Sequence, residues 1–209
     1  MPGTLWKLEQ NDELVTIRTP AVRIVFRRAA DRWSHEVGPD DGPARVASLE
    51  SEADPADASR VLSPVYQEVQ HHAFDDDERR VRLLLTGLLD RHHFSAVLTV
   101  SVDEGGATTI DFDVADRCRE PVASLAATYD VSLGAGELFQ ADGTSVRWAG
   151  GPLGEAELAM VAADGASLAL AERGPRAVQA QVLASLAPGA FTHRLRYRWT
   201  WAVRSGRTR

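Results

Sequence analysis

Cysteine is nearly absent from this chain, because Cys118 is the only one among 209 residues. A single cysteine excludes an intramolecular disulfide and a zinc site built from cysteines. No apolar run approaches the roughly 18 residues that a membrane-spanning helix needs. The N-terminus also lacks a basic stretch followed by an apolar one. We therefore expect a cytoplasmic protein with no membrane partner.

An excess of positive charge is also missing, since the formal net charge is −7. A general nucleic-acid binder needs a basic surface to neutralise phosphates, so no nucleic-acid partner is expected. The sequence has no Gly-x-Ser-x-Gly motif and no glycine-rich phosphate loop followed by lysine. We expect no cofactor, and no catalytic residue is assigned.

Helical periodicity is scarce, and the clearest pattern is an alternation near the C-terminus. Large side chains occupy every second position over residues 191–203, and Thr or Arg fills most positions between them. Such alternation predicts a β-strand with one packed face. The other face carries Arg194, Arg196 and Arg198, which must meet anions or water.

Similar alternation recurs along the chain, with turn signals about every 8 to 12 residues, which is typical of a sandwich or barrel. Residues 177–186 fit either a helix or a strand, and the all-β neighbourhood favours a strand. We predict one domain over residues 1–209, an all-β antiparallel β-sandwich. The expected strands are 14–19, 21–27, 33–37, 65–74, 80–89, 92–103, 108–115, 125–133, 138–140, 145–148, 158–162, 167–171, 177–186 and 191–203.

One long segment interrupts this pattern. Residues from about 38 to 63 are rich in Asp, Ala, Pro, Gly and Ser and show no sustained period. We predict a long acidic loop there, with a short helical turn near 56–61. A loop of this length is uncommon unless it covers something or moves, so it is a candidate lid or rim.

Most of the histidines come in adjacent pairs, His71-His72 and His92-His93. Adjacent residues of a strand point to opposite faces, so each pair sends one imidazole inward and one outward. A metal site needs ligands that converge from one face, as His-x-His would provide. We expect no metal site.

Asp111 and Asp113 share one face of a predicted strand. Two carboxylates about 7 Å apart are in range for glycoside chemistry. A row of aspartates opposite a row of arginines is also a common surface arrangement. We favour the second interpretation, in which the aspartates pair with the arginines of the closing strand.

The order of these strands resembles that of the galactose mutarotase-like sugar-binding β-sandwiches. The resemblance rests on the segment from Leu14 to Ile17, the hairpin with Phe94, Asp111-Phe112-Asp113 and the closing aromatic strand. It implies a carbohydrate-related cleft, and the mutarotases themselves use a His and a Glu in a sheet concavity. Sugars are held by aromatic rings together with planar polar groups. The candidate ligand-binding residues are Trp33, His35, Tyr66, His72, His93, Arg194, Arg196 and Arg198.

Three functions follow as hypotheses. The first is a protein that binds a carbohydrate or an anionic small molecule. The second is a sugar-acting enzyme of epimerase, hydrolase or lyase type that uses a His and a carboxylate. The third is a self-assembling protein whose arginine face meets the acidic segment 39–55 of another copy, and the sequence leaves the oligomeric state open.

Overall fold

β-strands account for nearly all of the regular structure. The computed structural model describes residues 4–40, 42, 44–49, 57–73, 76–133, 137–150, 153, 156–174 and 177–203. The strands are β1 (Lys7–Gln10), β2 (Leu14–Arg18), β3 (Arg23–Ala29), β4 (Arg32–Gly38), β5 (Arg45–Ser48), β6 (Arg60–Val61), β7 (Glu68–His71), β8 (Arg80–Leu89), β9 (His92–Val102), β10 (Thr108–Arg117), β11 (Ser124–Ser132), β12 (Glu137–Ala141), β13 (Ser145–Ala149), β14 (Ala156–Ala163), β15 (Ser167–Gly174), β16 (Ala177–Leu183) and β17 (Thr192–Val203).

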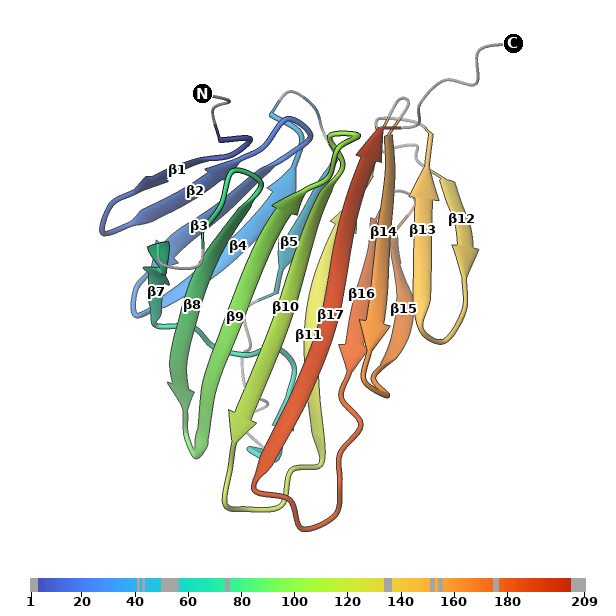
Figure 1. Cartoon of the computed structure of the whole chain (residues 1–209). Coiled ribbons are helices and arrows are strands. Elements are labelled where there is room, and N and C mark those ends of the chain that lie inside the picture. The colour runs from blue at the N-terminus through green and yellow to red at the C-terminus, as the bar shows by residue number, and fades with distance from the viewer. Residues whose placement is uncertain are drawn as a thin grey trace.

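The strands form two sheets that face each other, with the second in front in Figure 1. The first sheet has the order β1-β2-β3-β4-β5-β11-β16-β15, and β6 joins it beside β11. The second has the order β12-β13-β14-β17-β10-β9-β8-β7. The pairings are antiparallel except that of β6 with β11. The predicted antiparallel β-sandwich is confirmed, and so is the strand character of residues 177–183.

The core lies between the sheets because each long strand buries every second side chain. In β17 the inward residues Leu195, Tyr197, Trp199 and Trp201 are buried, as the alternation predicted. Burial of one large apolar side chain contributes about 1.5 to 3 kcal/mol. The strand lies near the middle of the second sheet, between β14 and β10. Phe191 departs from the prediction, because it precedes β17 and is 64% exposed.

The segment predicted as a long acidic loop contains two short strands. β5 lies between β4 and β11, and β6 pairs with β11. The predicted helical turn near 56–61 is wrong for residues 57–61, where a turn leads into β6, and residue 56 lies outside the described part. Both strands are short, so their pairing partners rather than their own periodicity specify them.

Asp164-Gly165 is a dipeptide typical of β-hairpin turns, and from the sequence we expect it to pair strands 158–162 and 167–171; this expectation is wrong. The turn connects β14 in the second sheet with β15 in the first. Both turn residues have positive φ, 54° and 79°, which suits a tight turn. The residues of a tight turn fix only the local backbone. The sheet that each strand joins depends on where its inward side chains pack.

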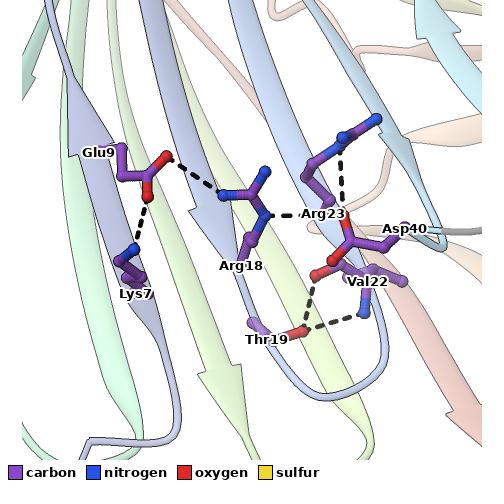
Figure 2. Close-up of polar contacts among 7 residues, drawn as sticks. All are labelled: Lys7, Glu9, Arg18, Thr19, Val22, Arg23 and Asp40. Atoms are coloured by element: carbon purple, nitrogen blue, oxygen red, sulfur yellow. Dashed lines mark hydrogen bonds and ion pairs between the residues drawn. The ribbon is translucent and has the colours of Figure 1, made fainter.

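Charged side chains on the first sheet join its edge strand to the segment after β4 (Figure 2). The carboxylate of Glu9 on β1 forms ion pairs with Nζ of Lys7 at 2.6 Å and with a guanidinium nitrogen of Arg18 on β2 at 3.1 Å. Asp40 lies 3.7 Å from Nε of Arg18 and 3.5 Å from Nε of Arg23. Exposed pairs of this kind contribute about 0 to 1 kcal/mol each. Asp40, an acidic residue of the segment after β4, therefore lies against arginines of its own chain.

A buried ion pair fixes the chain near β6 to the end of the second sheet. Nδ1 of His92 lies 2.8 Å from Oδ2 of Asp116, and Nε2 lies 3.1 Å from the carbonyl oxygen of Ala58. Both partners are acceptors, so a doubly protonated imidazole donates from both nitrogens. The hydrogen bond to Asp116 raises the pKa of His92 above its ordinary value, and burial opposes this.

We predict that His92→Gln lowers the free energy of unfolding in a pH-dependent way. Because the folded-state pKa is raised, the wild-type advantage is complete below about pH 6.5, the ordinary value for histidine. It should amount to about 1.5 to 3 kcal/mol there and shrink as the pH rises through the folded-state pKa. Urea unfolding from about pH 6 to about pH 9 measures it.

The matched control is His93→Gln, which changes the neighbouring histidine on the exposed face of β9. This variant should remain close to wild type at every pH. A stability difference for His92→Gln that is independent of pH would contradict the ion pair.

Candidate functional site

The arginines of β17 stand on the outer face of the second sheet and pair with the aspartates of β10. In register, Arg198 lies opposite Asp111 and Arg196 lies opposite Asp113. Nε of Arg198 is 2.6 Å from Oδ1 of Asp111. Asp113 accepts from Arg194 at 2.9 Å and from Arg196 at 3.0 Å. The predicted pairing of the two rows is confirmed.

Arg196, Arg198 and the two aspartates line a hollow of about 620 Å³ on the outer face of the second sheet. Figure 1 shows the strands that form its floor side by side, from β8 to β14. The lining side chains form two rows that run across the strands, each row made of residues that lie opposite one another in register. The first row is Val161, Arg198, Asp111, Thr99 and Arg82, and the second is Ala163, Arg196, Asp113 and Val97.

The hollow offers hydrogen-bond donors and acceptors side by side. Guanidinium groups donate, carboxylates accept, and the hydroxyl of Thr99 does both. Val97 and Val161 are 36% and 40% exposed and add apolar contact surface at two sides. A volume of this size is in the usual range for a small-molecule site. The arrangement suits a ligand that carries several hydroxyl groups.

The structure places three predicted site residues, His72, His93 and Arg194, outside this hollow, although Arg194 pairs with Asp113 at its rim. His93 is exposed on the same outer face, opposite Arg117 in register. His72 follows β7, and its backbone N–H donates to the carbonyl of Arg82 at 3.1 Å. None of the described residues that line the hollow is a histidine. The ligand-binding roles of these three residues stay predictions.

The structure brings Trp33, His35 and Tyr66 together, but inside the sandwich. All three are buried, at 8%, 4% and 3% exposure. They line a small, partly open space of about 20 Å³ at the edge of the core, which has room for about one water molecule. This space is separate from the hollow on the outer face, and a ligand role for these three residues also stays a prediction.

Hydroxyl groups and an imidazole form a chain across the core beside that space. Nε2 of His35 lies 3.1 Å from the hydroxyl of Tyr129, which lies 2.6 Å from the hydroxyl of Tyr197 on the opposite sheet. Burial lowers the pKa of His35 to about 3, so this imidazole is neutral at neutral pH. Burial also raises the pKa of Tyr66, and its hydroxyl has no partner among the described residues.

The sequence did not point to Arg82, Thr99 or Val161 as residues of the site. Each lies on a different strand, and only the register of β8, β9 and β14 brings it beside the β10–β17 pairs. Their outward positions within alternating strands were visible in the sequence. The order of the strands in the sheet was not.

Other classes of site receive no support from the described residues. They contain no group of three or more His, Cys, Asp or Glu side chains that could hold a metal ion. In the same part of the chain, no helix is long and apolar enough to cross a lipid bilayer. No protein-family model and no curated protein matches this chain.

We predict that two tyrosine substitutions in the core differ in their cost. Tyr197→Phe removes the hydroxyl that is bonded to Tyr129, so it should lower the free energy of unfolding by about 1 to 2 kcal/mol. Tyr66→Phe deletes a hydroxyl without a partner among the described residues and should cost less. Urea unfolding of both variants measures the difference, and an equal cost would contradict the observed bonding.

Proposed function

We propose that this protein binds a carbohydrate in the hollow on the outer face of its second sheet. The observation that carries the proposal is the pair of rows in which the guanidinium groups of Arg196 and Arg198 on β17 lie opposite the carboxylates of Asp113 and Asp111 on β10. A sugar hydroxyl both donates and accepts, so one hydroxyl can engage a guanidinium and a carboxylate at once.

The charges in the hollow favour a sugar over a strongly charged anion. Each arginine of β17 on this face already has a carboxylate oxygen within 3.0 Å. Arg196 has a second one, because it also pairs with Asp164 at 2.9 Å. Negatively charged carboxylates therefore lie among the guanidinium donors. A polyanion would be repelled by them, whereas a neutral sugar uses both kinds of group.

The resemblance to galactose mutarotase-like sandwiches supports the same class of ligand. That family also binds sugars on a sheet face, and its enzymes pair a His with a Glu. No described residue lining the hollow is a histidine, so the proposal is binding rather than epimerisation. A sugar-acting enzyme and self-assembly remain the competing proposals, and each predicts a different result below.

The proposal predicts that Arg198→Gln weakens sugar binding by about tenfold or more, because a charge-assisted hydrogen bond is lost. The measurement is titration calorimetry with glucose, galactose and their oligosaccharides, alongside glucuronate and galacturonate. Loss of the guanidinium should weaken the uronates more than the neutral sugars.

The matched control is Arg147→Gln. Arg147 is an exposed, ion-paired arginine on β13 of the same sheet, and it does not line the hollow. The control should bind like the wild type. No binding of any saccharide, or equal loss in both variants, would refute the proposal.

The competing functions would show themselves in the same samples. Turnover of a bound sugar, followed by NMR of its anomeric proton, would indicate the enzyme. Self-association that disappears at high salt would indicate assembly through the arginine face.

A further inference from the structure

A second depression lies at one end of the sandwich, away from the hollow. It has a volume of about 420 Å³ and is formed by residues 119–123, which follow β10, and residues 186–191, which precede β17. Both connections are at the lower end of Figure 1. They are joined by a hydrogen bond from the N–H of Cys118 to the carbonyl of Phe191 at 3.1 Å. We call this depression the end groove.

The walls of the end groove are mainly apolar. They are formed by Pro121, Val122, Leu186, Pro188 and Phe191, among other residues. Phe191 is 64% exposed, the highest value among the large hydrophobic side chains of the described chain. The two prolines restrict the backbone of both connections, so the groove is largely formed before anything binds. An apolar body on a ligand would cover this surface.

The floor of the groove holds a histidine without a partner. His193 is only 6% exposed and lines the groove, yet its Nε2 has no hydrogen-bond partner among the described residues. Asp116 lies opposite in register; its Oδ2 is bonded to His92, and its Oδ1 has no hydrogen-bond partner among the described residues. A buried imidazole nitrogen that makes no hydrogen bond is unfavourable, and a polar group of a ligand would relieve this.

The charge at the groove is positive. Arg119 lines it and makes no ion pair or hydrogen bond with the residues that the structure describes. Glu120 also lines it, but it is paired with Arg91. Asp116, opposite His193 in register, forms an ion pair with His92 when that imidazole is protonated, and the hydrogen bond from His92 to Asp116 raises the pKa of His92. An anionic group in the groove therefore meets the unpaired cation of Arg119, and the carboxylate that lines the groove, Glu120, is already paired with Arg91.

We infer that the end groove binds a small monocarboxylate with an apolar body. Its carboxylate lies with Arg119 and accepts a hydrogen bond from His193, and its branched aliphatic or aromatic part covers the wall around Leu186 and Phe191. This site is independent of the carbohydrate proposal, since the two depressions share no residue.

The test is calorimetric titration of the full chain with 4-methylpentanoate and benzoate. Their amides serve as neutral isosteres, and acetate serves as a carboxylate without the apolar body. The wild type should bind each acid at least about tenfold more tightly than its amide, as expected for one charged contact. Acetate should bind far more weakly than either acid.

Arg119→Gln should remove the preference for acid over amide and leave amide binding unchanged. Arg117→Gln is the matched control, because Arg117 is exposed two positions earlier and does not line the groove. His193→Phe should weaken acids and amides alike, since both accept the imidazole hydrogen bond. Arg119 is exposed, so its variant should fold even if the His193 variant does not.

Three results would overturn the inference. The first is equal affinity of the wild type for acids and amides. The second is acetate binding as tightly as the larger acids, which would show that the apolar wall is not used. The third is an unchanged acid preference in the folded Arg119→Gln variant.

Discussion

The register between β10 and β17 is the constraint on which the rest of the structure depends. Side chains alternate strictly along both strands, so one register places Phe112 and Tyr197 in the core and Asp113 opposite Arg196 on the surface. A slip by one residue would reverse every side chain of a strand, burying charges and exposing rings. The same register therefore builds the core and the proposed binding surface together.

Rings from both sheets meet behind this pair of strands. Trp199 stacks on Trp148 of its own sheet, with centroids 6.1 Å apart, and contacts Tyr129 of the opposite sheet at 5.3 Å. Tyr197 reaches the same tyrosine through its hydroxyl. The hollow thus lies on central strands that are fixed by packing from behind. Groups held on such strands are positioned more closely than groups on loops.

Much of the fold could be predicted from the sequence because alternation is a local property. Residues 80–89 and 92–102 form strands almost as their patterns indicate, and the pairing of Asp111 with Arg198 follows from two matching outward rows. β1, β5 and β6 are short and take their structure from neighbours, so no periodic signal marked them. β15 joins the sheet opposite β14, and the residues of the turn at Asp164 do not specify this.

The site could be predicted only for residues that lie on one strand, or on a second strand whose outward side chains carry the opposite charge. The pairing of Arg194, Arg196 and Arg198 with the aspartates of β10 was predicted in this way, and their ligand-binding role stays a prediction. Arg82 and Val161 belong to the same surface through strand order, which is a property of the whole sheet. Trp33, His35 and Tyr66 were grouped by residue type alone, and the structure places them in the interior.

The most direct test of the account is an amide NMR titration of the whole chain with the neutral sugar that binds most tightly. The account predicts that the shifted resonances cluster on β9, β10, β14 and β17, with Thr99, Asp111 and Arg198 among the largest changes. Shifts confined to the end groove, or to the edge strands β1 and β12, would contradict it.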